Sequence, residues 1–397
     1  MATRPPAARS VRAPRGETPL DAPGDTYVSA LAKVALDGPI LGQDRALATL
    51  GNAMVSGHFP HAWIFHGPVG TGKCTTAVRA AAVLVDPLSG DAQRAKCAPR
   101  VDTASATALR AGTHPDICVI RADLAGASAD REIRERKQNN IPVAVLREHM
   151  IGGLSSSGAR LEASVYTTSV MGAGKVFIID EAERLEVDGQ NVLLKTLEEP
   201  PPGTIIILVV NSLDRLLPTV RSRCQALAFF PLGDAAMNGW LDHNLGEVTG
   251  TQREFVRMYA AGSPGAAVTA VALDLKSLHG NLVPMIDQLE RGECPLSMSE
   301  LMNEFASSVA EAAVKRNENA SKEAANRRAT GLVFSVIGAE VLRRMRASVK
   351  VPSKLEYWSR VPQVIAEAER NLRANVNQKL VLADFVAQWS SLTGKSA

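Results

Sequence analysis

Eight consecutive residues have the types and spacing of a phosphate-binding P-loop, except at the last position. They are Gly67, Pro68, Val69, Gly70, Thr71, Gly72, Lys73 and Cys74, and Thr75 follows them. In this pattern the glycines allow a tight turn close to phosphate oxygens, and Lys73 would bind the outer phosphates. The last position normally carries a hydroxyl for Mg²⁺, which prefers oxygen ligands. We therefore predict a nucleotide site at residues 67–75 whose metal position is weakened by Cys74.

The segments on either side of this loop have the patterns of a strand and a helix. Ala62–Phe65 is apolar and predicts a buried strand, and residues 75–82 predict a helix that leaves the loop. The first N–H groups of such a helix are unpaired and would face the phosphates. A glycine-rich turn without a ligand is the alternative, and the flanking elements argue against it.

Two acids at the end of a later apolar run supply the second half of a nucleotide site. Val176–Ile179 is apolar, and Asp180 and Glu181 follow it directly. Asp180 would hold the Mg²⁺ shell, and Glu181 would polarise the attacking water as a general base. Solvated acids are common at strand ends, so this pair gains its meaning from the P-loop that precedes it.

Two further polar residues are candidates for contact with a terminal phosphate. Asn211 follows the apolar run Thr204–Val210 at the carboxyl end of an expected strand, although an isolated asparagine is more typical of a turn. Arg223, in Ser222–Cys224, is expected within a short helix, from which it could reach a neighbouring subunit's nucleotide as an arginine finger. The residues alone favour an ordinary surface arginine there.

Composition restricts the classes of protein that the chain can belong to. Its 397 residues are 46% hydrophobic and 21% charged, which is typical of a soluble globular protein with two or three domains. The net charge of +3 is too small to indicate nucleic-acid binding by itself, and apolar runs such as Ile205–Val210 are too short to span a membrane. The five cysteines are scattered without a C-x-x-C pair, which argues against zinc and disulfides and favours the reducing cytoplasm.

The first 25 residues are rich in arginine and proline and hold no acid before Glu17. An Arg-rich transit peptide is one interpretation of such a leader. The prolines oppose the amphipathic helix that a transit peptide needs, so a disordered arm at residues 1–25 is the preferred interpretation.

Residues 26–231 alternate apolar strand-like runs with helical stretches, which predicts an α/β fold with a parallel sheet flanked by helices. The candidate strands are Ala62–His66, Ile117–Arg121, Lys175–Asp180 and Thr204–Asn211, and Gly189–Leu197 is a candidate helix. Residues 84–113 are expected to form a loosely structured insertion. The alternating charges of Asp130–Lys137 predict a solvated helix face.

Helical patterns dominate the rest of the chain. Residues 232–278 predict a small helical unit that is broken at Gly262–Gly265, and residues 279–397 predict an all-helical region. The longer amphipathic helices are expected at Met298–Arg316, Lys322–Arg346, Lys354–Val376 and Lys379–Leu392.

Several short motifs occur in the order that is typical of one family. They are Ile40–Gln43, Pro60–Trp63, the P-loop, Gly112–Asp116, Asn191–Pro201 and Ser222–Cys224. Over roughly residues 38–268 the chain resembles the clamp-loader ATPases of the AAA+ class. Within that family it is most similar to the delta-prime type of bacterial DNA polymerase III, through Gly262–Ala267 and Asn371–Leu382.

This resemblance implies an architecture, partners and ligands. It implies an AAA+ P-loop domain at residues 26–231, a helical lid at 232–278 and a helical collar for oligomerisation at 279–397. Subunits of this type help a pentameric complex to load the sliding clamp onto primed DNA, and they supply an arginine finger in trans, which here is Arg223. The implied partners are the motor and delta subunits, the clamp and, through the complex, primed DNA, with no membrane. The implied ligands are ATP and Mg²⁺, whose binding Cys74 predicts to be weak or absent.

The chain departs from the family's pattern in ways that bear on activity. Cys74 replaces the metal-binding hydroxyl, and only Cys97 remains where the family has a four-cysteine zinc module, so no zinc is expected. The motor subunits carry an arginine in the segment that corresponds to Gly262–Ala267, and this chain does not. Conversely, the pair Asp180 and Glu181 is intact, although delta-prime subunits often have degenerate acids there. We expect weak or no ATP hydrolysis by the isolated chain.

Two other functions stay open. An active gamma-type clamp-loader motor, or a helicase loader, is favoured by Lys73 and Glu181 but opposed by Cys74 and the arginine-free Gly262–Ala267 segment. A P-loop kinase would use Lys73 for phosphoryl transfer to a small molecule. The helical C-terminal region and Ser222–Cys224 argue against a kinase.

Overall fold

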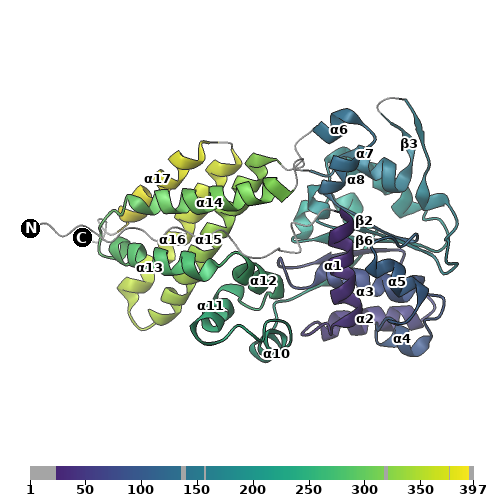
Figure 1. Cartoon of the computed structure of the whole chain (residues 1–397), viewed down its shortest axis with the longest axis horizontal. Helices are drawn as coiled ribbons and strands as arrows, with labels where there is room; N and C mark the ends of the chain where they lie inside the picture. The colour runs from purple at the N-terminus through teal and green to yellow at the C-terminus, as the bar shows by residue number, and fades with distance from the viewer. Residues whose placement is uncertain (1–23, 136–139, 156–157, 317–320, 375, 393–397) are drawn as a thin grey trace, which may run out of the picture.

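The computed structural model describes residues 24–135, 140–155, 158–316, 321–374 and 376–392. An α/β part and a mostly helical part follow each other along the chain and lie side by side (Figure 1). The arm predicted at residues 1–25 lies almost wholly outside the described residues. Its last two residues, Gly24 and Asp25, begin helix α1, so the predicted arm extends too far at that end.

A five-stranded parallel sheet with the strand order β2-β5-β6-β1-β7 forms the centre of the α/β part. The strands are β1 (Ala62–His66), β2 (Ile117–Ile120), β5 (Lys175–Ile179), β6 (Thr204–Val210) and β7 (Gln225–Ala228). The apolar runs predicted the first four of these to within one residue. They missed β7, because it is a short edge strand whose first two residues are exposed.

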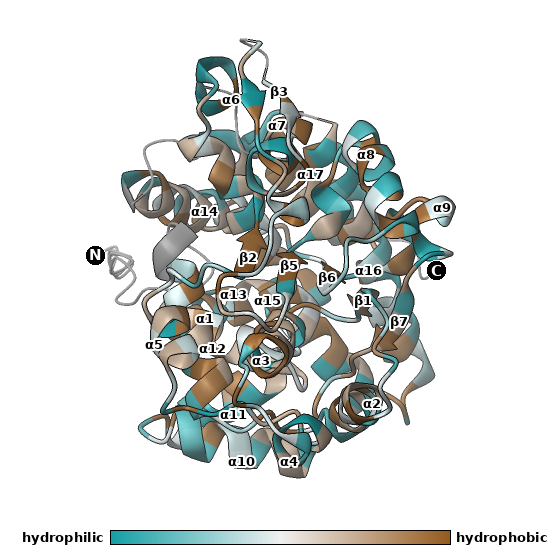
Figure 2. Ribbon diagram, turned by 90° about the vertical axis from the view of Figure 1, so that its right-hand side faces the viewer, coloured by the Kyte–Doolittle hydropathy of each residue, from teal (hydrophilic) through white to brown (hydrophobic). Residues whose placement is uncertain are grey.

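Helices cover both faces of the sheet, and its central strands are drawn largely in the brown of hydrophobic residues (Figure 2). One face packs against α1 (Gly24–Asp37), α2 (Asp44–Val55), α3 (Lys73–Val85) and α5 (Ala104–Arg110). The other packs against α7 (Val143–Leu146), α8 (Val187–Glu198) and α9 (Pro218–Arg221). Alternate residues of β5 enter the two cores, with Ile178 on the first side and Ile179 on the second. Burial on both faces explains why these strands are almost continuously apolar.

The expectation of a loosely structured insertion at residues 84–113 is wrong for much of that stretch. It holds the short helices α4 (Asp91–Ala95) and α5, and the Thr103 side chain caps α5 by accepting a hydrogen bond from the Ala106 N–H at 3.1 Å. Leu109 of α5 is fully buried. A cap and one buried leucine hold a helix that is too short to show a clear period in the sequence.

Short elements complete the α/β part. The solvated helix expected at Asp130–Lys137 is present as α6 (Arg131–Glu135), and residues 136 and 137 lie outside the described residues. A small antiparallel ribbon joins β3 (Gly153–Leu154) to β4 (Arg160–Leu161). Short 3-10 helices occur at η2 (Ala122–Ala127), η4 (Ser164–Tyr166), η5 (Ala182–Arg184) and η6 (Leu213–Arg215), and a short π-helical segment occurs at η3 (Arg147–Ile151).

The rest of the described chain is helical. Its helices are α10 (Asp234–Asn244), α11 (Gly250–Ala260), α12 (Pro264–Ala272), α13 (Leu275–Glu290), α14 (Ser297–Arg316), α15 (Lys322–Ala347), α16 (Pro352–Arg373) and α17 (Gln378–Ser390). The last four were predicted with small errors at their ends. Helix α13 was missed, since Gly280 and Pro284 lie inside it. One hydrophobic core runs from Leu232 to Trp389, so α10–α12 and the C-terminal helices are packed as a unit.

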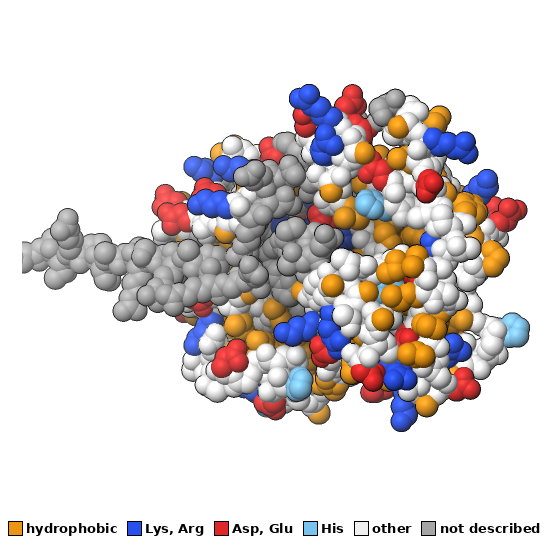
Figure 3. All heavy atoms as spheres, turned by 45° about the vertical axis from the view of Figure 1, so that its right-hand side comes forward, with side chains coloured by type: hydrophobic (Ala, Val, Ile, Leu, Met, Phe, Trp, Pro, Cys, Tyr) orange, Lys and Arg blue, Asp and Glu red, His pale blue; other side chains and the backbone are white. Residues whose placement is uncertain are grey.

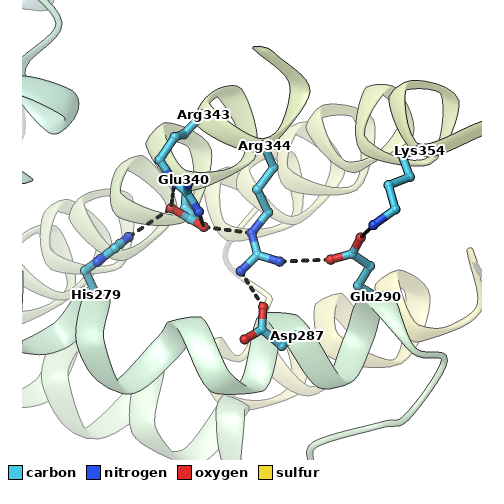
Figure 4. Close-up of polar contacts among 7 residues, drawn as sticks. All are labelled: His279, Asp287, Glu290, Glu340, Arg343, Arg344 and Lys354. Atoms are coloured by element: carbon cyan, nitrogen blue, oxygen red, sulfur yellow. Dashed lines mark hydrogen bonds and ion pairs between the residues drawn. The ribbon is translucent and has the colours of Figure 1, made fainter. Parts of the chain in front are cut away.

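A network of charged side chains links α13, α15 and the start of α16 (Figure 4). Its members are His279, Asp287, Glu290, Glu340, Arg343, Arg344 and Lys354. The Glu340 side chain is fully buried and accepts hydrogen bonds from Arg343 at 2.6 and 2.7 Å and from Arg344 at 2.7 Å. His279 lies 3.0 Å from the same carboxylate. Two arginines thereby supply positive charge to the buried acid, and His279 adds a further hydrogen-bonding partner.

The surface carries charges of both signs. On the face in Figure 3, Lys and Arg side chains are interspersed with Asp and Glu side chains over the α/β part. This agrees with the small net charge of +3. No helix in the described part of the chain is long and apolar enough to cross a membrane.

Candidate nucleotide site

The P-loop connects β1 to α3 in a conformation that its glycines permit. Gly67, Gly70 and Gly72 have φ angles of 141°, 75° and 91°. A Cβ atom on Gly67 would lie 2.2 Å from the Phe229 carbonyl oxygen, so this position has no room for a side chain. Helix α3 begins at Lys73, and its first N–H groups face the end of the loop. The backbone therefore has the form of an anion-binding loop.

Lys73 is folded against its own loop. Its side chain is 6% exposed, and Nζ donates to the carbonyl oxygens of Gly67 and Pro68, each at 2.7 Å. Nζ also donates to Oδ1 of Asn211 at 3.1 Å, so the structure brings these two predicted residues together. Burial lowers the pKa of Lys73, and the negative charges of Glu183 and Asp180 oppose that shift.

Glu183 belongs to this site and was not predicted. Its Oε1 accepts hydrogen bonds from Asn211, from the side-chain Nδ2 at 2.5 Å and from the backbone N–H at 3.2 Å. Burial raises the pKa of Glu183. A series of hydrogen bonds thus runs from Lys73 through Asn211 to Glu183. The sequence offered only a weak signal, namely a third acid shortly after Asp180.

Asp180 is satisfied by protein groups. It is 8% exposed, its Oδ2 accepts a hydrogen bond from the Tyr27 hydroxyl at 2.6 Å, and its Oδ1 accepts one from the Glu181 N–H at 3.0 Å. Burial raises the pKa of Asp180, while the Tyr27 hydrogen bond and the charge of Arg121 oppose that rise. Sequence analysis missed Tyr27, which is 153 residues away along the chain.

Cys74 lies beside this pair. Cys74 packs against the hydrophobic core that contains Tyr27, and its thiol interacts electrostatically with Asp180. Burial raises the pKa of Cys74 well above its usual value, so the thiol is protonated at neutral pH. A neutral sulfur and a carboxylate already bonded through both oxygens do not fit Mg²⁺, which takes oxygen ligands. Among the described residues no group of three or more His, Cys, Asp or Glu side chains could hold a metal ion.

Glu181 points toward an arginine. It has a left-handed backbone conformation, with a φ angle of 51°, and its carboxylate pairs with Arg184 at 2.6 Å. Burial would raise the pKa of Glu181, but Arg184, assisted by Arg328 and Arg121, outweighs burial and lowers it. A carboxylate held ionised by an arginine is a weaker base, so this arrangement does not favour activation of water.

Arg223 lies outside the short helix in which it was expected. Helix α9 ends at Arg221, and residues 222–224 form the turn before β7, because the chain must straighten there to join the edge of the sheet. The Arg223 guanidinium pairs with Glu198 at 2.5 Å and donates to the Thr219 carbonyl at 2.8 Å. Its side chain is 34% exposed. Arg221 instead pairs with Asp214 at 3.2 Å.

The start of α12 lies directly on the P-loop. The Ser263 hydroxyl donates to the Val69 carbonyl, and the Gly265 N–H donates to the Gly70 carbonyl, both at 2.9 Å. A Cβ atom on Gly265 would lie 2.7 Å from the Cα atom of Gly70. The arginine-free segment noted in the sequence thus contacts the phosphate loop through a hydroxyl and backbone groups.

Comparisons with known proteins bear on the same region. Residues 42–233 match the profile of the family described as "DNA polymerase III, delta subunit". The DNA polymerase III subunit delta' of Pseudomonas aeruginosa is 32% identical over 221 residues, which are 55% of this chain and 56% of that protein. Residues 42–233 are therefore similar to subunits of DNA polymerase III. The chain spans about half the length of the delta' relatives it matches.

Other members and one solved structure are also similar. The tau subunit of Bacillus subtilis is 31% identical over 201 residues, which are 50% of this chain and 30% of that protein. The crystal structure of a DNA polymerase III gamma subunit-related protein from Thermotoga maritima aligns with 87% of this chain and 99% of that one. Its TM-score is 0.42 and its sequence identity is 16%, so this likeness carries no argument about the clamp-loader role.

Proposed function

We propose that this chain is a delta-prime-type subunit of a bacterial clamp loader, which helps a pentameric AAA+ complex to load the sliding clamp onto primed DNA. One observation carries the proposal. In this chain's own P-loop site, the Asp180 carboxylate that would bind the metal accepts a hydrogen bond from Tyr27, and Cys74 supplies a neutral thiol where the metal needs an oxygen. Such a subunit assists hydrolysis elsewhere in the complex. Its proposed partners are the motor and delta subunits, the clamp and primed DNA, and its proposed location is the cytoplasm.

In this proposal, residues 26–231 form the AAA+ domain, 232–278 the lid and 279–397 the oligomerising collar. The core shared by the last two segments favours a lid that moves together with the collar. The apolar stripe of α15 that includes Phe334, Ile337 and Val341 is buried in this core. Contacts with other subunits therefore have to use exposed residues of the region, such as Leu380, which is 66% exposed.

The proposed contribution to catalysis comes from Arg223, in the nucleotide site of a neighbouring subunit. Arg223 precedes β7, the edge strand, so its guanidinium lies at the outer side of the sheet rather than at its centre. A partly exposed ion pair such as Arg223–Glu198 contributes about 0–1 kcal/mol, so a terminal phosphate can replace Glu198. A guanidinium can then bridge two phosphate oxygens.

The test is a reconstituted complex that carries Arg223→Ala, with Arg221→Ala as the matched control. Arginine fingers contribute about 10³-fold or more in phosphoryl transfer. We expect Arg223→Ala to leave assembly intact, as seen by gel filtration, and to lower DNA-stimulated ATP hydrolysis and clamp loading. The loss of ATP hydrolysis measured for the whole complex is smaller than the loss at the one affected site, because the other sites stay active. Equal behaviour of the two variants, or no change in turnover, would overturn the role of Arg223.

A gamma-type motor is the second candidate, and the intact pair Asp180 and Glu181 with Lys73 favours it. The two candidates differ in one measurement, which is ATP turnover by the purified chain alone. A delta-prime-type subunit is expected to show negligible turnover. Turnover at the rate of a working AAA+ motor would favour the second candidate.

A further inference from the structure

We infer that Tyr27 closes the metal position of the P-loop site, so that a nucleotide bound there is bound without a divalent cation. The inference rests on the proposed use of residues 67–75 as a nucleotide site, and it is independent of the role of Arg223. At the metal position this chain has a thiol, Cys74, in place of the family's hydroxyl, and a tyrosine hydroxyl that is hydrogen-bonded to the acid.

The Tyr27 hydroxyl is hydrogen-bonded to the acid that would hold the metal, and Cys74 packs against the same core as Tyr27. The hydroxyl donates to Asp180 at 2.6 Å, and the Cys74 thiol interacts electrostatically with the same carboxylate. The residue at position 74 and the acid after β5 are the two protein positions from which a P-loop enzyme ligates Mg²⁺. The tyrosine is 2% exposed, so its hydroxyl fills this place as part of the core.

A fixed positive charge accompanies the hydroxyl. The guanidinium carbon of Arg121 lies 3.5 Å from the centre of the Tyr27 ring, and Arg121 also pairs with Asp123 at 3.5 Å. The charge of Arg121 acts on Asp180 and favours its ionised form. A divalent cation bound at Asp180 would therefore be repelled by Arg121 and would have to displace the Tyr27 hydroxyl.

Helix α1, which carries Tyr27, packs into the core beside the sheet and is anchored by polar contacts at its C-terminal end. Arg79 of α3 donates from Nε to the Ala35 carbonyl at 2.9 Å and from Nη2 to the Gly38 carbonyl, which satisfies carbonyls at the end of α1. Arg110 of α5 pairs with Asp37 at 2.6 Å. These contacts keep Tyr27 in place without help from a ligand.

The phosphate side of the site keeps its binding groups. The unpaired N–H groups at the start of α3 can bind anionic oxygens without a metal, and so can Lys73 once a phosphate replaces the loop carbonyls to which its Nζ donates. We therefore expect the affinity for ATP, if the chain binds it, to be the same in Mg²⁺ and in EDTA.

The experiment compares binding of a fluorescent ATP analogue to the full chain in Mg²⁺ and in EDTA. Wild type is expected to show a ratio of affinities near one, or no binding in either condition. The double variant Tyr27→Phe/Cys74→Thr removes the hydroxyl and supplies an oxygen ligand. It is expected to bind roughly 10-fold or more tightly with Mg²⁺ than with EDTA. Each single substitution is expected to give a smaller dependence of the affinity on Mg²⁺. The control Tyr166→Phe/Cys294→Thr, at exposed positions, is expected to leave the ratio of affinities unchanged.

Two outcomes of this binding experiment would overturn the inference. One is wild-type binding that is at least 10-fold tighter in Mg²⁺, and the other is a double variant that is folded by circular dichroism yet gains no dependence on Mg²⁺. Titration of wild type with Mn²⁺ and ATP, followed by electron paramagnetic resonance, needs no substitution, and one protein-bound Mn²⁺ per chain would also refute closure. Failure here leaves the Arg223 test intact, because that test measures a neighbour's site.

Discussion

Two buried acids, Asp180 in the nucleotide site and Glu340 in the helical region, are treated differently by the chain. Asp180 receives one hydroxyl and one amide hydrogen bond, and burial raises its pKa. Burial alone would also raise the pKa of Glu340, but hydrogen bonds from Arg343, His279 and Arg344 outweigh it and hold that pKa far below its usual range. The charge of a buried carboxylate is thus decided by how many charged donors face it.

The difference separates a structural cluster from a site that can respond to ligands. Both carboxylate oxygens of Glu340 have hydrogen-bond partners, and the network joins α13 to α15 across the helical core (Figure 4). At Asp180 the Tyr27 hydrogen bond and the charge of Arg121 offset only part of the cost of burying the carboxylate, and such a raised pKa is typical of positions that bind ligands or catalyse. Changes to the first should therefore affect stability most, and changes to the second should affect ligand binding most.

The largest expected effect on stability is that of Glu340→Gln. It leaves Arg343 and the buried Arg344 without the carboxylate that they share, and breaking a buried ion pair costs about 3–5 kcal/mol. Urea unfolding at pH 7 should show a loss of about 3 kcal/mol. The control is Glu356→Gln, which breaks the exposed Glu356–Arg360 pair and should cost less than about 1 kcal/mol. Equal losses would mean that the network is not the stabilising unit.

The next prediction is that the difference in stability between wild type and Glu340→Gln depends on pH. The folded-state pKa of Glu340 lies below its ordinary value of 4.5, so the ionised network stabilises the fold above about pH 4.5 and loses this effect as the pH falls. The gap between wild type and Glu340→Gln should shrink by about 1.4 kcal/mol per pH unit below that point. Asp180 acts with the opposite sign, because its raised pKa disfavours folding at neutral pH and this cost disappears in acid. Urea unfolding between pH 7 and 3.5 measures the gap, and a constant gap would contradict the prediction.

A smaller effect is expected for Tyr27→Phe. It removes the donor to Asp180 but keeps the ring against Arg121, so a loss of about 1–2 kcal/mol is expected in thermal or urea unfolding. Tyr166, which is 55% exposed, supplies the control Tyr166→Phe, with a change below about 0.5 kcal/mol. A Tyr27→Phe variant as stable as wild type would show that the hydroxyl does not satisfy Asp180.

The elements that were predicted are those with a strong local pattern. Strands β1, β2, β5 and β6 follow from apolar runs, and the P-loop follows from the spacing of its glycines and lysine. The elements that were missed, such as β7 and α5, are short and depend on neighbours for their stability. Helix α13 could have been found from Leu278, Leu282 and Ile286, which have helical spacing, although Gly280 and Pro284 inside it are poor helix formers.

The partners within the candidate site were harder to predict than its location. The motifs identified Lys73, Cys74 and Asp180, whereas Tyr27 and Arg121 come from other elements and reach the site only through the tertiary fold. The contacts of Arg223 and Glu181 with nearby charges also needed the structure. Sequence patterns give the types of group that a site holds, and packing decides whether those groups are free to react.

The contact between the P-loop and α12 gives the chain a mechanical connection. Ser263 and Gly265 hold the carbonyls of Val69 and Gly70, and α12 buries Ala267 in the same core as the C-terminal helices. A P-loop that changes shape at those carbonyls must therefore break two hydrogen bonds or move α12 and the helices packed on it. By thermodynamic reciprocity, the free energy that couples a change in the phosphate loop to a shift of the helical region is the same in both directions. Such a linkage transmits strain between the two regions even in a chain that hydrolyses no ATP of its own.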